Sequence, residues 1–159
     1  MSSQRPTIKK IQTCFNNDVK GLQFLCPKDK NKGKVGLLLE RLLDIPTSSA
    51  CLDCADGELK TFPQTKATSR TRVSKQVGDY IADGSVAVNH VKPEELPNTS
   101  FEESNLYKKI SHVLFIPYVR TDDLIEFHDD VIFNKEHPLF EQIKNKLQSI
   151  DICFFSTGT

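Results

Sequence analysis

The segment at residues 113–119, VLFIPYV, narrows the possible folds more than any other part of this chain, because nearly every position is apolar. A run of this length and composition is typical of a strand that is buried on both faces of a sheet. No apolar run in the sequence approaches the roughly 20 residues that a bilayer span requires. We therefore expect a domain built around a central sheet, with no membrane partner.

Segments with apolar residues at every third or fourth position alternate with short strand-like runs along the chain. Helices are predicted over residues 5–25, as one helix or two short ones, and over residues 35–45, 101–111 and 138–150. Strands are predicted over residues 50–53, 58–62, 85–88, 113–119 and 150–155. Such alternation predicts an α/β fold with a central mixed β-sheet flanked by helices. A length of 159 residues fits one domain, so we expect residues 1–159 to form a single domain.

The five cysteines, at positions 14, 26, 51, 54 and 153, follow no repeating framework, and the N-terminus lacks the apolar core of a signal peptide. A reducing, cytoplasmic setting is therefore expected. Cys51 and Cys54 have the spacing of half a zinc site, but no second pair of cysteines or histidines completes it, so packing against the core is favoured. His112, directly before the apolar strand, is expected to be a hydrogen-bonded structural histidine.

Charge is balanced over the whole chain, with 21 basic and 21 acidic residues, but it is unevenly distributed. Residues 59–78 contain no acidic residue, residues 28–34 contain one acid among four lysines, and residues 121–143 contain seven acids and one base. We predict that the basic segments follow a phosphate backbone while the acidic segment faces water, although a solvated polar loop would have the same composition. The predicted DNA-binding residues are Lys32, Lys34, Lys66, Arg70, Arg72 and Lys75.

The pair Asp56–Gly57 lies between two short strand-like runs, a pattern that predicts a β-hairpin. With a two- or four-residue turn, Asp53, Glu58 and Lys60 share one face, whereas a three-residue turn would separate them. Two carboxylates and an ammonium group can hold Mg²⁺ and orient or deprotonate an attacking water. Leu59 would bury its side chain behind this face, and its carbonyl is a further candidate metal ligand. An exposed surface ion pair is the alternative interpretation.

Three sequence blocks, in this order, resemble the MutH-type DNA mismatch repair endonucleases and the related restriction enzymes that cut at GATC. The blocks are KGKVGLLLE at residues 32–40, GELKTFP at residues 57–63 and FEESNLYKKISHVLFIP at residues 101–117. The resemblance implies the PD-(D/E)xK superfamily, a restriction-endonuclease-like fold and a metal-dependent endonuclease. The substrate would be double-stranded DNA, cut by water attack at or near GATC to leave 5′-phosphate ends.

The resemblance also implies roles for individual residues. Asp53 and Glu58 would hold Mg²⁺, with Mn²⁺ as a substitute, and Lys60 would be the catalytic lysine. Glu40 would be a supporting carboxylate and Lys109 a second active-site lysine. Because Asp53 and Glu58 are closer in sequence than their counterparts in the family, Asp56 stays open as an alternative metal ligand.

The cellular role and the mode of base recognition stay open. Repair together with other mismatch repair proteins and restriction are both compatible with the residues, and a non-catalytic DNA-binding or repair-partner module with a vestigial site is the alternative function. The sequence ends at Thr159, whereas family members continue into a segment that recognises bases. We expect that segment to be absent here or its role to be taken by residues 64–100.

Overall fold

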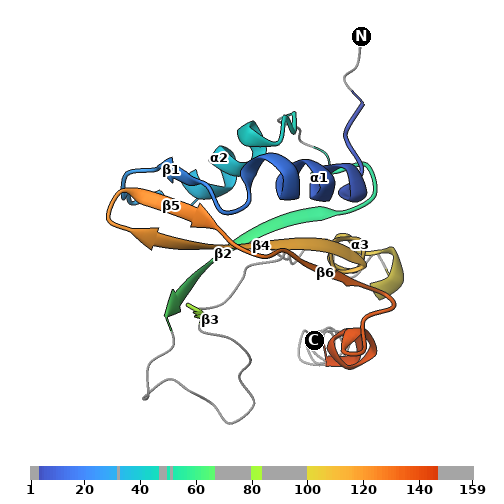
Figure 1. The fold of residues 1–159 in the computed structure, drawn as a ribbon. Coiled ribbons are helices and arrows are strands. Elements are labelled where there is room, and N and C mark those ends of the chain that lie inside the picture. Colours follow the sequence, from blue (N-terminus) through green and yellow to red (C-terminus); the bar gives the residue numbers. More distant parts are fainter. Residues whose placement is uncertain are drawn as a thin grey trace.

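The computed structural model describes residues 4–31, 33–46, 50, 52–66, 80–83 and 100–146 (Figure 1). Six strands in this part form one mixed sheet in the order β1-β5-β4-β2-β3, and β6 also pairs with β4. The strands are β1 (Gln23–Leu25), β2 (Glu58–Lys66), β3 (Tyr80–Ala82), β4 (His112–Thr121), β5 (Leu124–Phe127) and β6 (Val131–Asn134). Helices flank this sheet, so the predicted α/β fold with a central mixed sheet is confirmed.

The predicted apolar strand is β4, which lies at the centre of the sheet. One edge of β4 pairs in parallel with β2, in a register that places Glu58 opposite Val113 and Lys60 opposite Phe115. The other edge pairs antiparallel with β6 near its start and with β5 near its end. Val113, Leu114 and Ile116 are buried, and because successive side chains point to opposite faces, both faces of this strand are covered. Burial on both faces explains why almost every position of β4 is apolar. The parallel pairing also places β2 beside this buried strand.

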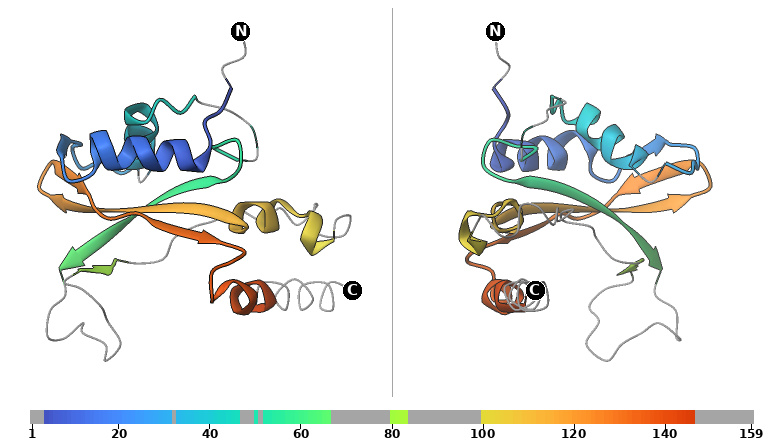
Figure 2. Two further views of the ribbon diagram at one scale, coloured as in Figure 1. Left: turned by 45° about the vertical axis from the view of Figure 1, so that its right-hand side comes forward. Right: turned by 180° about the vertical axis from the view of Figure 1, so that it is seen from behind.

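A first layer of helices covers one face of the sheet, as Figure 2 shows from two further directions. It consists of α1 (Ile8–Cys14), the π-helical turn η1 (Phe15–Val19) and α2 (Lys34–Leu42). These helices and the sheet bury one apolar cluster, which includes Ile8, Phe15, Leu39, Leu59 and Leu114. The helix predicted over residues 35–45 is therefore confirmed as α2, apart from its last turn.

The helix predicted over residues 5–25 is wrong in its last part. The helical stretch ends at Val19, and Gly21 then takes a positive φ of 79°. Glycine adopts this conformation without the steric penalty of a side chain, so the chain can turn there. It continues into β1, where Leu25 pairs with Leu124 of β5.

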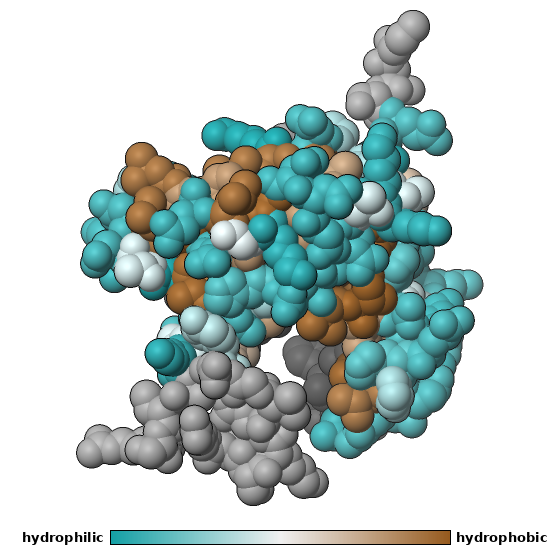
Figure 3. All heavy atoms as spheres, viewed as in Figure 1, coloured by the Kyte–Doolittle hydropathy of each residue, from teal (hydrophilic) through white to brown (hydrophobic). Residues whose placement is uncertain are grey.

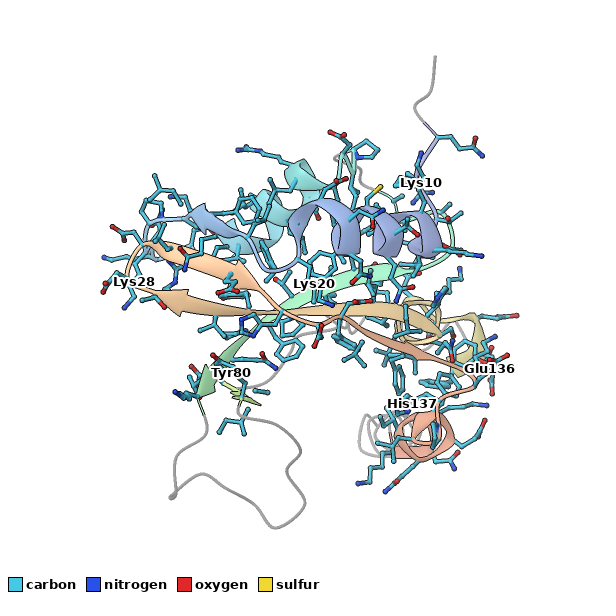
Figure 4. All side chains as sticks on the ribbon, viewed as in Figure 1. Lys10, Lys20, Lys28, Tyr80, Glu136 and His137 are labelled. Atoms are coloured by element: carbon cyan, nitrogen blue, oxygen red, sulfur yellow. The ribbon has the colours of Figure 1, made fainter. Side chains whose placement is uncertain are left out.

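A second apolar cluster lies on the other side, around α3 (Asn105–Ile110). It is built by the 3-10 turn η3 (Phe101–Glu103), α3 itself and a helix over residues 140–146, with Phe101, Ile110 and Phe140 buried. The helix predicted over residues 101–111 is interrupted at Ser104, whose hydroxyl accepts a hydrogen bond from the Tyr107 amide and caps α3. Figure 4 shows Glu136 and His137 beside the last described helix, where His137 Nδ1 accepts a hydrogen bond from the Leu139 amide.

The predicted hairpin at Asp56–Gly57 is wrong. Residues 53–57 form a bent loop, and the described positions of the strand predicted over residues 50–53 carry no strand. A two-residue hairpin turn lies instead at Asp122–Asp123, between β4 and β5, where Asp122 has a φ of 54°. Sequence analysis also missed β5 and β6, which lie in the acidic segment. The strands predicted over residues 85–88 and 150–155 lie outside the described residues.

The molecular surface in Figure 3 is mostly hydrophilic. Apolar groups gather near the end of the β1–β5 pair, where Leu25 and Leu124 are exposed. In the segments that the structure describes, no helix has both the length and the apolar character needed to cross a membrane.

Candidate active site

The candidate site lies where β2 begins. Along one edge β2 pairs with β4, and among the described strands its other edge is paired only at residues 64–66, with β3. The loop of residues 52–57 lies beside the first half of β2, where the Leu59 amide donates a hydrogen bond to Asp53. Both views of Figure 2 show the start of β2 and α3 at the same end of the sheet. The segment of residues 52–60 and α3, which are distant in sequence, therefore meet at this point.

Glu58, the first residue of β2, is the one charged residue in the described part of the chain that is buried, with 3% exposure. Its Oε1 lies 3.2 Å from Nζ of Lys60, two positions along the same strand, and 3.7 Å from Nζ of Lys109 on α3. Both lysines are largely covered, with side-chain exposures of 24% and 20%. A buried carboxylate requires such partners, because an uncompensated charge in the interior is strongly unfavourable.

Asp53 and Glu58 are held next to each other by a reciprocal pair of hydrogen bonds. The Asp53 amide donates to Oε2 of Glu58, and the Leu59 amide donates to Oδ2 of Asp53, each over 3.3 Å. The amide and carbonyl of one strand residue point to the same edge of the strand, so the Leu59 carbonyl faces the Asp53 side as well. The Leu59 side chain is buried in the first apolar cluster. The burial predicted for this side chain is confirmed.

The cluster contains three carboxylates, on Asp53, Glu58 and Glu40, and two lysines, Lys60 and Lys109. Burial and the neighbouring charge of Asp53 raise the pKa of Glu58, although Lys60 and Lys109 act in the opposite direction. Burial likewise raises the pKa of Glu40, on α2, and the charges of Asp53 and Glu58 raise it further. Glu40 therefore lies within electrostatic reach of both carboxylates. Carboxylates whose pKa values are raised by burial and by each other are typical of functional sites.

The donor set at this point fits Mg²⁺ chemically. Carboxylate and carbonyl oxygens are the ligands that Mg²⁺ prefers, and proteins usually hold this ion through one or two carboxylates while it keeps several waters. Asp53, Glu58 and the Leu59 carbonyl would provide such a set, and a cation there would relieve the excess negative charge. Within the described segments, no group of three or more His, Cys, Asp or Glu side chains forms a metal cluster, so the candidate set contains only these two carboxylates.

Asp56, the alternative metal ligand, has its carboxylate at the start of α1 and near His112. Its Oδ1 accepts a hydrogen bond from the Ile8 amide at 2.7 Å, at the start of α1, and its Oδ2 lies 3.9 Å from Nδ1 of His112. His112 Nδ1 also lies within hydrogen-bond distance, 3.0 Å, of the Asp56 carbonyl. His112 is therefore a hydrogen-bonded structural histidine, as predicted. Because the Asp56 carboxylate binds the helix end, the geometry favours Asp53 as the carboxylate beside Glu58.

Comparison with protein families decides which class of protein carries this cluster. The family model described as the DNA mismatch repair enzyme MutH matches residues 47–150, which is more than half of the chain. The chain belongs to the MutH family. Membership indicates a DNA-binding endonuclease of mismatch repair. No curated protein matches the chain significantly.

The MutH match includes four of the five residues with predicted catalytic roles. Asp53, Glu58, Lys60 and Lys109 lie within the matched range, whereas Glu40 precedes it. The structure brings all five into one cluster, through ion pairs, hydrogen bonds or electrostatic effects on pKa. Their roles in metal binding and catalysis remain predictions.

Two of the predicted DNA-binding residues, Lys34 and Lys66, lie in the described part of the chain, and neither forms an ion pair with the carboxylates of this cluster. Lys34 is the first residue of α2 and forms an exposed ion pair with Asp29 at 3.2 Å. Lys66 ends β2, six residues after Lys60, which corresponds to about 20 Å of extended strand. The other four predicted residues, Lys32, Arg70, Arg72 and Lys75, lie outside the described residues.

Cys54, half of the CxxC pair, is fully buried in the first apolar cluster, as predicted. Burial raises the pKa of its thiol to about 12, and the negative charges of Asp53 and Asp56 act in the same direction. A zinc ligand must be a thiolate, which this environment disfavours. Cys51 lies outside the described residues.

The contacts that hold the loop of residues 52–57 were missed by sequence analysis. They come from residues 5–8, in an N-terminal stretch whose composition carries no signal of a site. His112 was singled out as structural, but its partner could not be identified from spacing, since Asp56 lies 56 positions away.

Proposed function

We propose that this MutH-family protein is a Mg²⁺-dependent DNA endonuclease that hydrolyses a phosphodiester bond at the start of β2. The observation that carries the proposal is Glu58, a buried carboxylate flanked by Lys60 and Lys109 and placed beside Asp53. A purely structural ion pair would not require a second carboxylate whose charge raises the pKa of the first. Such mutual destabilisation is expected where a cation binds during function.

Each residue has a distinct role in the proposed reaction. Asp53, Glu58 and the Leu59 carbonyl would hold Mg²⁺, which when bound polarises the scissile phosphate and lowers the pKa of water. Lys60 would orient the attacking water and stabilise the negative charge that develops on the phosphate oxygens. Lys109, from α3, would add positive charge at the same carboxylate oxygen, Oε1 of Glu58. Glu40 would support the cluster as a further carboxylate close to Lys60.

The proposal extends to the DNA target and to protein partners. Cleavage at or near GATC is proposed because the blocks at residues 32–40, 57–63 and 101–117 resemble enzymes that cut there. Mn²⁺ is expected to replace Mg²⁺, since both accept oxygen ligands. Recruitment by other mismatch repair proteins is proposed from the family to which the chain belongs.

Cleavage of duplex DNA with the Glu58→Ala and Lys60→Ala variants tests this function. One duplex carries a single GATC and a second carries the same bases in scrambled order, each with and without Mg²⁺. We expect nicking of the GATC duplex only with Mg²⁺, and a loss of about 100-fold or more in rate for both variants. Lys10→Ala, at an exposed position on α1 (Figure 4), serves as the matched control.

The control variant should cleave like the original protein, and circular dichroism should show that all variants remain folded. Equal cleavage by the original protein and both site variants would overturn the assignment of the site. DNA binding without cleavage under any metal condition would instead support a non-catalytic DNA-binding module.

A further inference from the structure

The loop of residues 52–57, which carries Asp53, is attached to the N-terminal segment of the chain. Residues 5–8 run beside this loop and bind it at three points. The contacts are a hydrogen bond from Arg5 to the Leu52 carbonyl, one from the Ala55 amide to the Pro6 carbonyl (2.9 Å) and one from the Ile8 amide to Oδ1 of Asp56 (2.7 Å). The loop is therefore held by residues that do not belong to the cluster around Glu58.

Asp56 is the residue that joins the most elements at this point. Its side chain accepts from the first amide of α1, one of the helix amides that lack a partner within the helix. Its backbone carbonyl lies 3.0 Å from His112 Nδ1, at the start of β4. A negative charge at a helix start is also favourable because of the helix dipole. Asp56 therefore ties the loop to both α1 and β4.

Gly57 shows how closely the loop is packed between these two elements. A Cβ atom at this position would lie 2.6 Å from the His112 carbonyl oxygen and 2.7 Å from Cγ1 of Ile8. Contacts this short require the absence of a side chain. The loop is thus enclosed on the sides of α1 and β4.

The contacts of Asp53 itself are weaker than those of Asp56. Asp53 is held through two hydrogen bonds of 3.3 Å, to Glu58 and Leu59, and the two carboxylates repel each other. These two long hydrogen bonds act against that repulsion, and the contacts of the rest of the loop add to them in keeping Asp53 beside Glu58. The hydrogen bond from the Cys54 amide to the Gly57 carbonyl, at 3.0 Å, closes that loop internally.

We propose that Asp56 is a positioning residue, which fixes the loop to α1 and β4 and thereby holds the Asp53 carboxylate against Glu58 for metal binding. The inference rests on the proposed function, because it assigns the metal to Asp53 and Glu58. From the sequence, Asp56 was an alternative metal ligand. The inference makes it a residue that positions the loop instead.

Three variants of the full chain separate positioning from general stability. Asp56→Ala removes the acceptor for the Ile8 amide, and Asp56→Asn keeps an acceptor oxygen there. Thr7→Ala removes the other side-chain cap of the same helix end, the bond from the Lys10 amide to Thr7 Oγ1 at 3.2 Å, and leaves the three hydrogen bonds from residues 5–8 to the loop in place. The readouts are Mn²⁺ binding by calorimetry without DNA, and hydrogen exchange at the Cys54 amide without metal.

We expect Asp56→Ala to weaken Mn²⁺ binding by about tenfold, a typical effect of removing a group that orients a metal ligand. Exchange at Cys54 should also become faster in this variant. Asp56→Asn should bind Mn²⁺ within about twofold of the original protein, because it retains the hydrogen bond that positions the loop. Thr7→Ala should lower the melting temperature but leave both readouts unchanged.

Unchanged Mn²⁺ binding and unchanged Cys54 exchange in Asp56→Ala would overturn the inference, as would an equal loss in Thr7→Ala. Absence of Mn²⁺ binding by the original protein would overturn the proposed function instead. In that case faster Cys54 exchange in Asp56→Ala alone would still support the role of Asp56 in holding the loop.

Discussion

Glu58 combines two properties that seldom occur together in a residue that serves stability alone. It is buried next to two lysines, yet burial and Asp53 still raise its pKa above the ordinary value of 4.5. The ionised form is therefore less favourable in the folded protein than in the unfolded chain. Natural proteins retain such unfavourable groups mainly where function requires them.

The raised pKa of Glu58 predicts how the stability of the metal-free protein changes with pH. Below pH 4.5 the carboxyl is protonated in both the folded and the unfolded state, so its contribution to stability is fully present. As the pH rises through the folded-state pKa, that contribution is lost. Glu58→Gln removes the titrating group, so the variant should gain stability relative to the original protein as the pH rises.

Thermal unfolding with a chelator from pH 4 to pH 8 measures this difference, with Glu141→Gln as a control at an exposed position. A melting-temperature difference between Glu58→Gln and the original protein that stays constant over this range would contradict the role assigned to Glu58.

The site residues differ in how they can be recognised from the sequence. Asp53, Glu58 and Lys60 lie within eight positions of each other, so local spacing could group them even though the hairpin used for that grouping is wrong. Lys109 and Glu40 are brought to Glu58 by tertiary structure, from α3 and α2. Spacing carries no information on such contacts, and these two residues were found through the family resemblance.

At the level of elements, the position of the β2 start depends on the loop before it. The sequence Asp-Gly usually predicts a two-residue hairpin, but Gly57 serves a close approach to α1 and β4 instead. The real hairpin turn uses Asp122–Asp123, because aspartate also tolerates the positive φ of 54° found at Asp122. Local sequence signals cannot distinguish a turn from a packing requirement when the neighbouring element is distant in sequence.

Two glycine substitutions test this packing. Gly57→Ala should destabilise the protein by about 1–3 kcal/mol, because a Cβ would overlap the His112 carbonyl and Ile8. Gly36→Ala has no atom within 4 Å of the new Cβ and lies inside α2, so it should stabilise by about 0.5–1 kcal/mol. Denaturant unfolding of both variants measures the free energies, and equal effects of the same sign would contradict the packing described for Gly57.

At the scale of the whole molecule, two apolar clusters enclose the site from different sides. The first packs α1 and α2 on the sheet, and the second packs α3 against β6 and residues 140–146. The alternation of helices and strands predicted this general architecture. The acidic segment after Arg120 contains β5 and β6, which were missed because each strand is only four residues long and gives too short a pattern to be read from the sequence.

Lys109 is the residue at which a nuclease site formed from segments far apart in sequence is best tested. Lys109 and Lys108 are adjacent on α3, but only Lys109 lies 3.7 Å from Glu58, whereas Lys108 is exposed. The decisive measurement is the single-turnover rate of GATC-duplex cleavage with saturating Mg²⁺ for Lys109→Ala and Lys108→Ala. We expect a loss of about 100-fold or more for Lys109→Ala and a change within about twofold for Lys108→Ala. Equal rates for the two variants would show that Lys109 is not part of the nuclease site.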